Sequence, residues 1–346
     1  MGNPTIHPTG QQILPREPAQ IEPDGSTRAF LLRSCAALGA ALLLPQGRAL
    51  AQGSHPDARS GEPIGVLFPE LGEPFRKVFL DILAGIEAAA PQRVRAWPLA
   101  PGHNLAELST ALRRSGAKVV VALGRQGLKA AAVLDPATGV VVGGVSTVPG
   151  GERQFGVCLT PDPALLFARL KTLLPAVRRV AVVYNPELNE WLMRGARAAA
   201  AGLGLELVTH EARDLAAAAR LYQASFAGAD SRRDALWLPI DATTIDEAAT
   251  IPLVLRESWN RAVPVFSSSL AHVNKGVLFS LYPNNAELGR TLGKLAAGLL
   301  GGEPGARGVT PLRDVYAALN LRTASHFGIA TDARTQRAFN YLYPPA

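Results

Sequence analysis

The stretch VPVFSSSLAHVNKGVLFSL, Val263 to Leu281, contains two short apolar runs separated by three serines and a few further polar residues. Serine is common where a strand gives way to a turn, so the triplet has an ordinary structural interpretation. Serines at the carboxyl ends of parallel strands also line the crevice in which such folds hold their ligands. The stretch alone leaves both interpretations open, and the rest of the chain must decide between them.

Short β-branched apolar runs recur along the whole chain around this stretch. They are IGVLF from Ile64, AKVVVALG from Ala117, GVVVGGVS from Gly139, RRVAVVYN from Arg178, LELVTH from Leu205 and DALWLPID from Asp234. Segments with helical spacing lie between them, including 74–89, 105–114, 190–201 and 245–261. Strands without internal alternation, separated by helices, are typical of parallel sheets covered on both faces. The sequence therefore predicts an α/β protein.

The series of strands and helices begins again near the middle of the chain, which predicts two doubly wound parallel-sheet lobes joined by a multi-strand hinge. Gln154 to Pro163 is a strand-like crossing, and Tyr282 and Pro283 mark a second crossing before a helix at 286–300. We expect lobe 1 to contain 63–157 and 284–306, and lobe 2 to contain 158–283 and 307–346. A cleft between two such lobes would enclose a small ligand.

Composition excludes several classes of protein. The chain has 346 residues, 48% of them hydrophobic and 18% charged, which favours a packed globular protein of two domains over extended disorder. The formal net charge is +7, but no run of five Lys or Arg occurs. Because a nucleic-acid site would cluster its positive charge, we expect no nucleic-acid partner.

Residues 1–51 predict a cleaved signal peptide. Arg28 and Arg33 flank the start of an apolar segment whose uninterrupted part, Cys35 to Leu44, is too short to span a bilayer, and ALA at 49–51 provides a small-residue cleavage site. STRAFLL is similar to a twin-arginine export signal, but Thr27 occupies one arginine position, so general secretion is the prediction. Residues 52–62 form a linker, and the mature protein is expected in the periplasm.

Polar residues gather where the predicted strands end, and these are the candidate ligand-binding residues. They are Glu70, Arg125, Gln126, Tyr184, Asn185, Asp241, Thr243, Ser267, Ser268, Ser269 and Tyr282. Each alone is ordinary turn or helix-cap chemistry, and their recurrence at the same topological place carries the prediction. Asp241 is the candidate partner of a ligand amine, and a cap over Thr243 and Thr244 is the alternative for this carboxylate.

Enzyme and metal signatures are absent from the sequence. It contains no G-x-S-x-G elbow, no P-loop, no G-x-G-x-x-G after the first strand and no H-E-x-x-H. The six histidines are scattered without the spacing of metal ligands. We therefore expect no catalysis, no cofactor and no metal site.

Four segments resemble, in this order, a family of ABC-transporter substrate-binding proteins. They are RRVAVVYNPELN, DALWLPIDATT, VPVFSSSLAHVNKGVLFSLYPNNAELGRTLGKLAAGLL and DVYAALNLRTASHFGI. The similarity runs from Ile64 to Ile329, and 263–300 is its most specific part. The resemblance implies the type I periplasmic-binding-protein fold, with two lobes that close on a ligand and perform no chemistry on it; some members bind aromatic amino acids.

Two loops depart from the pattern of that family. Arg125 stands where the family usually has Thr or Ser, and the acidic PELGEP, with Glu70 and Glu73, replaces a short serine-containing loop. Arg125 lies before a helix, so its guanidinium is a candidate clamp for a carboxylate or phosphate. An ion pair with Glu70 or Glu73 is the alternative.

The leading functional prediction is an exported solute-binding protein of an ABC importer. Its partners would be a small polar ligand, for which an amino-acid-like compound is one candidate, and a membrane permease that receives this ligand. The alternative is a periplasmic sensing module that passes a ligand-dependent change of shape to a membrane receptor or kinase.

Overall fold

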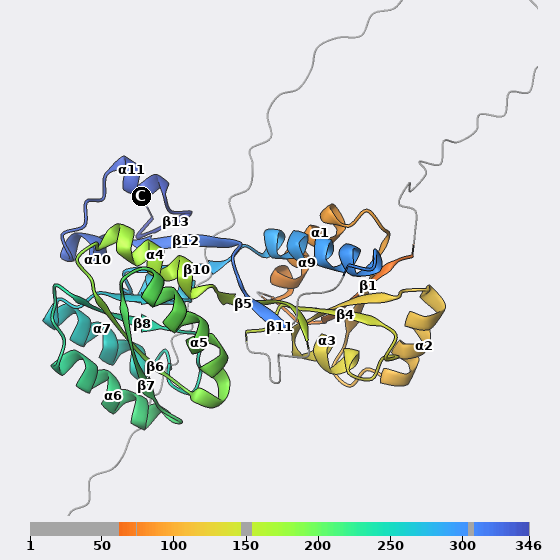
Figure 1. Ribbon diagram of the computed structural model, residues 1–346, viewed down its shortest axis with the longest axis horizontal. Coiled ribbons are helices and arrows are strands. Elements are labelled where there is room, and N and C mark those ends of the chain that lie inside the picture. Colours follow the sequence, from red (N-terminus) through yellow and green to blue (C-terminus); the bar gives the residue numbers. More distant parts are fainter. Residues whose placement is uncertain (1–61, 74, 147–153, 304–307, 346) are drawn as a thin grey trace, which may run out of the picture. The chain divides into compact units, whose positions relative to one another are not determined.

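The computed structural model describes residues 62–73, 75–146, 154–303 and 308–345. The predicted signal peptide lies outside these residues, as does all of the predicted linker except Glu62. The described strands form one sheet of six strands and a second sheet of seven (Figure 1). Each sheet is covered by helices, and each has its own apolar core.

The first sheet is parallel in every described pair and has the order β11-β5-β4-β3-β1-β2. Its strands are β1 (Ile64–Pro69), β2 (Val94–Leu99), β3 (Val119–Leu123), β4 (Gly139–Gly143), β5 (Phe155–Pro161) and β11 (Gly308–Leu312). All five residues of the central β3, VVVAL, are buried. A strand buried on both faces needs no polar alternation, which is why this run is uniformly apolar.

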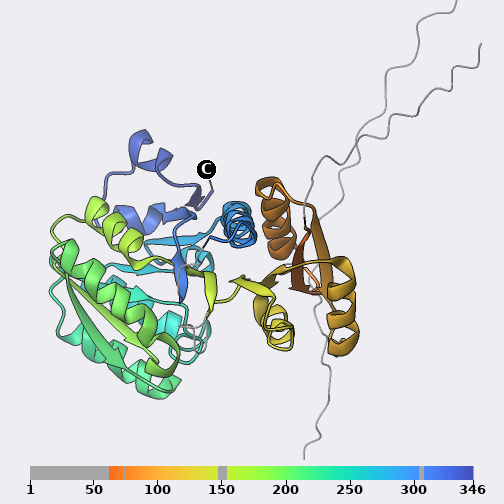
Figure 2. The same ribbon diagram turned by 45° about the vertical axis from the view of Figure 1, so that its right-hand side comes forward.

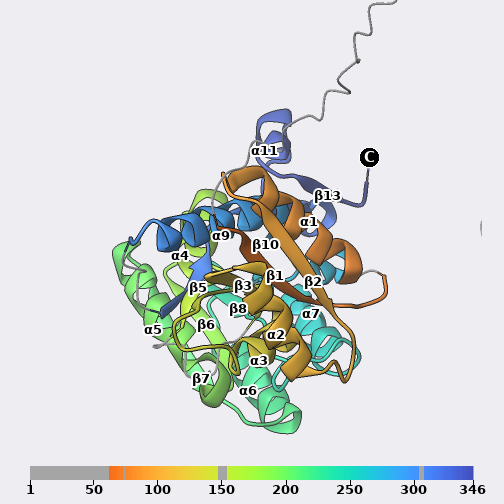
Figure 3. The ribbon, with the colours of Figure 1, turned by 90° about the vertical axis from the view of Figure 1, so that its right-hand side faces the viewer.

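Helices cover both faces of the first sheet. Helices α1 (Phe75–Ala89) and α9 (Asn285–Leu300) pack against the side chains of one face. Helices α2 (Leu105–Ser115) and α3 (Gly124–Ala131) pack on the other face, as Figure 3 shows. Adjacent residues of β3 therefore enter different cores: Val121 joins the layer of α1 and α9, and Val120 joins the layer of α2 and α3.

Helices α1 and α9 lie side by side although some two hundred residues separate them (Figure 2). Their backbones approach closely at two glycines. A Cβ on Gly85 would lie 2.1 Å from the carbonyl oxygen of Ala286, and a Cβ on Gly289 would lie 2.1 Å from that of Ile82. Any larger side chain at either position would push the two helices apart.

The second sheet is parallel except for one pair and has the order β13-β12-β10-β9-β8-β6-β7. Its strands are β6 (Arg179–Tyr184), β7 (Glu206–Glu211), β8 (Asp234–Leu238), β9 (Val265–Ser267), β10 (Phe279–Pro283), β12 (Val315–Asn320) and β13 (Tyr341–Tyr343). The antiparallel pair is β10 with β12, in which Tyr282 lies opposite Tyr316. The carboxyl ends of β6, β8, β9 and β10 therefore lie at one edge of this sheet.

Two layers of helices enclose the second sheet. Helices α4 (Pro163–Leu173) and α5 (Pro186–Gly202) cover one face, whereas α6 (Leu215–Ala227) and α7 (Thr250–Arg261) cover the other (Figure 1). Short helices α8 (Leu270–Lys275), α10 (Leu321–His326) and α11 (Ala333–Arg337) complete the fold. Fully buried Trp237 lies in the layer of α4 and α5 and contacts the ring of Phe167 edge to face, with centroids 5.5 Å apart.

The predicted α/β architecture with two parallel-dominated sheets is confirmed, and two helix bounds differ from expectation. The helix expected at 190–201 begins at Pro186, because the side chain of Asn185 caps it and proline suits its first turn. The helix expected at 245–261 begins only at Thr250, because Asp246 organises a separate turn before it. The residue bounds given above for the two lobes stay a prediction.

None of the helices among the described residues is long and apolar enough to cross a membrane.

Candidate functional site

The carboxyl edge of the second sheet brings together several of the predicted site residues. Parallel register places Trp237 beside Val182 on β6 and beside Phe266 on β9, so the three strands end at the same level. The loops that follow carry Asn185, Asp241 and Ser268. The predicted residues of β6, β8, β9 and β10 thus share one edge, which we call the ligand edge: Tyr184, Asn185, Asp241, Thr243, Ser267, Ser268, Ser269 and Tyr282.

Asp241 is the centre of a buried hydrogen-bond network. Its Oδ2 accepts the backbone N–H of Asn185 at 2.7 Å and the side-chain amide of Asn189 at 3.0 Å. Its Oδ1 accepts the backbone N–H of Thr243 at 3.0 Å and the Thr243 hydroxyl at 2.6 Å. The carboxylate therefore joins the loop after β6 to the loop after β8, and each oxygen already accepts two hydrogen bonds. A carboxylate offers about four lone-pair sites, so a ligand amine would have to displace a donor already present.

Two of the three serines also form hydrogen bonds inside the protein. The Oγ of Ser267 lies 2.7 Å from Nδ1 of His272 and accepts the backbone N–H of Ser269 at 3.0 Å. The Oγ of Ser268 accepts the indole N–H of Trp237 at 3.2 Å. Burial lowers the pKa of His272, so its ring is neutral near pH 7. These two serines tie the end of β9 to α8 and to the core.

Ser269 and Tyr282 are the ligand-edge residues whose hydroxyls have no hydrogen-bond partner within the described part of the chain. Both side chains are half-buried. The ring of Tyr282 packs against that of Tyr316 with centroids 5.7 Å apart. Burial raises the pKa of Tyr282, and the neighbouring Tyr316 and Tyr341 raise it further, so its hydroxyl keeps its proton at neutral pH.

Tyr184 and Asn185 form side-chain hydrogen bonds with helix α5. The fully buried Tyr184 donates its hydroxyl to Oε2 of Glu190 at 2.5 Å, and Arg197 donates to Oε1 of the same carboxylate at 2.7 Å. Burial, together with the Glu190 carboxylate, raises the pKa of Tyr184 to about 12. The side chain of Asn185 accepts the backbone N–H of Glu187 at 3.0 Å and so caps the helix.

Three predicted site residues lie near the first sheet and not at the ligand edge: Glu70 follows β1, and Arg125 and Gln126 are in α3. Glu70 is exposed after β1, and its backbone N–H donates to the Leu99 carbonyl at 3.0 Å. Arg125 is exposed in the first turn of α3, and among the described residues it forms no ion pair with Glu70 or Glu73. The Oε1 of Gln126 is buried without a described hydrogen-bond partner. The ion pair considered as the alternative for Arg125 is therefore not formed.

Three of the residues that organise the ligand edge are not among the candidate ligand-binding residues predicted from the sequence. Asn189 reaches Asp241 from the second turn of α5, His272 pairs with Ser267 from α8, and Tyr316 packs on Tyr282 from an antiparallel strand. Asn189 and His272 each lie on the helix that directly follows a strand of this edge, which was a signal for both, whereas the contact of Tyr316 depends on strand register. In the described ranges no group of three His, Cys, Asp or Glu side chains could hold a metal ion.

Comparison with known proteins places this geometry in a family context. Residues 167–339 match the model of the family described as ABC transporter substrate binding protein. No curated protein matches the chain. That family is one of substrate-binding proteins and not of enzymes.

Three solved structures share the fold at low sequence identity. The ABC domain in complex with L-Trp from Streptococcus pneumonia is 20% identical, with a TM-score of 0.52 over 82% of this chain and 100% of that one. A conserved domain protein from Vibrio cholerae is 19% identical, with a TM-score of 0.51 over 81% and 99%. The ligand-free, open structure of a substrate binding protein with adhesive properties from Clostridium difficile is 15% identical, with a TM-score of 0.59 over 81% and 99%.

Proposed function

Because the chain belongs to the family of ABC transporter substrate-binding proteins, we propose that it is an exported solute-binding protein that encloses a small polar ligand between two lobes and delivers it to a membrane permease. The family match over 167–339 is the observation that carries this proposal, because it contains the whole ligand edge of the second sheet. A structural relative of the same fold holds L-Trp, so an amino acid is the first candidate ligand.

Side chains with unused hydrogen-bonding groups are the contacts that we propose first. On the second sheet these are Ser269 and Tyr282, and on the first sheet they are Arg125 and Gln126. A desolvated polar ligand must find a partner for each of its donors and acceptors, since each unpaired group costs about 1–3 kcal/mol. Glu70 remains a candidate on the same grounds, because it is exposed beside the strand end.

Mass spectrometry of small molecules released from gently purified protein tests the proposed function directly. The expected result is one retained compound that carries both an amino and a carboxylate group. Adding the compound back to the stripped protein should raise the melting temperature by mass action and reduce the radius of gyration in solution scattering. A compound that binds in calorimetry but leaves both quantities unchanged would contradict closure of two lobes.

A matched pair of tyrosine variants tests the ligand edge. Tyr282→Phe removes one hydroxyl and keeps the packing on Tyr316, so affinity should fall about two- to tenfold, the value of one neutral hydrogen bond. Tyr343→Phe is the control, because Tyr343 pairs with Asn320 at the opposite edge of the same sheet. Equal affinities of the two variants would remove the Tyr282 hydroxyl from the site.

Export is tested separately from binding. We propose that the signal peptide is removed after Ala51 and that the mature protein resides in the periplasm. Amino-terminal sequencing of the protein recovered from a periplasmic extract should start at Gln52. A protein that keeps Met1 and stays with the cytoplasmic fraction would contradict the proposal.

A further inference from the structure

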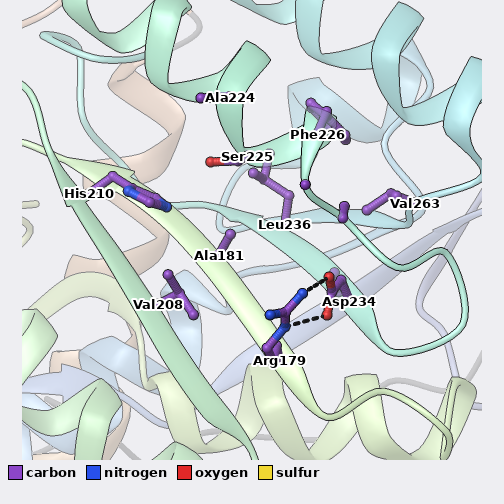
Figure 4. A pocket seen from close by; sticks show the side chains of 13 residues that line it. Arg179, Ala181, Val208, His210, Ala224, Ser225, Phe226, Asp234, Leu236 and Val263 are labelled. Atoms are coloured by element: carbon purple, nitrogen blue, oxygen red, sulfur yellow. Dashed lines mark hydrogen bonds and ion pairs between the residues drawn. The ribbon is translucent and has the colours of Figure 1, made fainter.

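A cavity of about 200 Å³ lies in the second sheet, between strands β6, β7 and β8 and the last turn of α6 (Figure 4). Its wall includes Arg179 and Asp234, the first residues of β6 and β8, and Val263, which precedes β9. Those residues mark the amino ends of parallel strands. The cavity therefore begins at the amino edge of the sheet and extends over the α6 face as far as His210, which pairs with Val183. None of the ligand-edge residues lines it, so it is a separate feature of the fold.

The side chains of α6 explain why this space is not filled. The helix contacts α7 and β6, and its large residues Tyr222 and Phe226 are buried in the core between them. In its last turn it lines the cavity with the small residues Ala224 and Ser225, beside part of Phe226. Strand β7 is the edge of the sheet, and its central residues stay half-buried. Small side chains above an incompletely covered edge strand leave the cavity.

The lining is mostly apolar. Val208, Ala181 and Leu236 form the floor, since Ala181 pairs with both of the others in the parallel register. An apolar cavity of 150 Å³ in another protein is large enough to bind benzene, so this cavity has room for one substituted aromatic ring. Ligand sites of this kind pair an apolar lining with a small number of polar groups.

The polar groups of the cavity carry no net charge near neutral pH. The guanidinium of Arg179 is bound by both oxygens of Asp234, with Nε to Oδ1 at 2.8 Å, as the dashed lines in Figure 4 show. Burial raises the pKa of Asp234, but its hydrogen bonds with Arg179 outweigh burial and hold this pKa below the ordinary value. Burial lowers the pKa of His210, which keeps that imidazole neutral. An anion entering the cavity would meet a guanidinium that is already paired.

His210 supplies the polar group that a ligand can use. Its ring lies on the cavity wall apart from the ion pair, and it has no hydrogen-bond partner among the described residues (Figure 4). A neutral imidazole offers one donor and one acceptor. The hydroxyl of Ser225 donates to the Leu221 carbonyl at 2.8 Å and is committed to its own helix.

We propose that this cavity is an accessory binding site for a small neutral aromatic molecule bearing one hydrogen-bonding substituent, held by the apolar floor of β6, β7 and β8 and by the ring of His210. The site goes beyond the proposed transport function and does not depend on it. Its ligand would stabilise the second lobe by mass action, because the binding surface exists only when β7 and α6 are folded together.

Titration with phenol as the probe, followed by NMR chemical shifts on the full mature chain, tests the proposal. Ala224→Leu should fill the cavity and weaken phenol binding at least tenfold. Ala227→Leu is the matched control, because Ala227 is exposed in the same last turn of α6 and does not line the cavity. Saturable binding that is lost only in the Ala224 variant supports the site. Equal binding by both variants, or no saturable binding by the wild type, overturns it.

Three further measurements examine the chemistry of the ligand and the location of its site. His210→Phe keeps a ring in place and removes the hydrogen bond, so phenol should bind at least threefold more weakly. Unchanged affinity in this variant would overturn the role of His210. Benzoate should bind at least tenfold more weakly than phenol, and the reverse order would overturn the choice of a neutral ligand. Tyr282→Phe should leave phenol affinity unchanged, and a loss there would assign the signal to the ligand edge.

Discussion

Asp241→Asn separates the structural role of this carboxylate from a role in ligand binding. The amide keeps one acceptor oxygen, which is best placed toward Asn185 and Asn189, where two N–H donors need it. The amide nitrogen then faces Thr243, whose hydroxyl can rotate to accept, but the Thr243 backbone N–H loses its acceptor. An unsatisfied N–H in partly buried surroundings costs about 1–3 kcal/mol. We expect the free energy of unfolding to fall by that amount.

Urea denaturation of the ligand-free protein measures this loss. Asp246→Asn is the matched control, because Oδ1 of Asp246 alone accepts the backbone N–H groups of Ala248 and Ala249, and an amide oxygen can do the same. Its unfolding free energy should stay within about 0.5 kcal/mol of the wild type. Calorimetry on the same variants then reports ligand affinity. If Asp241→Asn unfolds like the wild type and instead weakens binding by about 2–5 kcal/mol, the carboxylate serves the ligand and the structural reasoning is refuted.

Three further variants test other parts of the molecule. Gly289→Ala should destabilise the protein by about 1–3 kcal/mol, because the added Cβ would meet the Ile82 carbonyl. Gly195→Ala is the control: Gly195 has open space around it, so this change should stabilise the protein by up to about 1 kcal/mol. Equal urea midpoints for the two variants would contradict the close contact of α1 and α9. Burial lowers the pKa of His272 below 6.5, so the imidazole binds a proton more readily in the unfolded chain, and the free energy of unfolding should drop as the pH falls below about 6.5. His272→Gln should make this dependence of stability on pH less steep. An unchanged dependence on pH would exclude His272 as its source. Arg125→Ala should weaken binding of an acidic ligand at least tenfold, about 1.4 kcal/mol, and leave the stability of the unliganded protein unchanged. A loss of stability without a loss of affinity would show that Arg125 has a structural role instead.

The fold could be predicted because its signal is local and repeated. Uniformly apolar runs such as Val119–Leu123 indicate strands that are covered on both faces, and they recur between helical segments. The pairing of distant elements carries no such signal. The contact of α1 with α9 depends on Gly85 and Gly289, whose importance is visible only when the two backbones are placed together. The antiparallel pairing of β12 with β10 is likewise a matter of register and not of composition.

The gathering of polar residues at one edge of the second sheet was predictable, but their hydrogen bonding was not. Parallel strands end at one edge, so polar residues after β6, β8 and β9 were expected to gather there, and they do. The direction in which each side chain points depends on contacts from other elements. His272 determines the orientation of Ser267, and Glu190 determines that of Tyr184, and the sequence does not show which polar side chain of the following helix makes each contact.

A strand end in this fold needs polar side chains before any ligand is present. The loop N–H groups of Asn185 and Ser269 are satisfied by Asp241 and Ser267, and without these acceptors each would cost about 1–3 kcal/mol. Folding and ligand binding thus require the same residue types at the same edge, so residue type cannot tell them apart. The two roles can be distinguished by whether the hydrogen-bonding groups of a side chain are already used within the protein. A side chain whose hydrogen bonds are all formed gains a ligand contact only by losing a comparable bond. Changes at Asp241 and Ser267 should therefore alter stability first, and changes at Ser269 and Tyr282 should alter affinity first; the reverse order in paired denaturation and calorimetry would contradict this division of the edge.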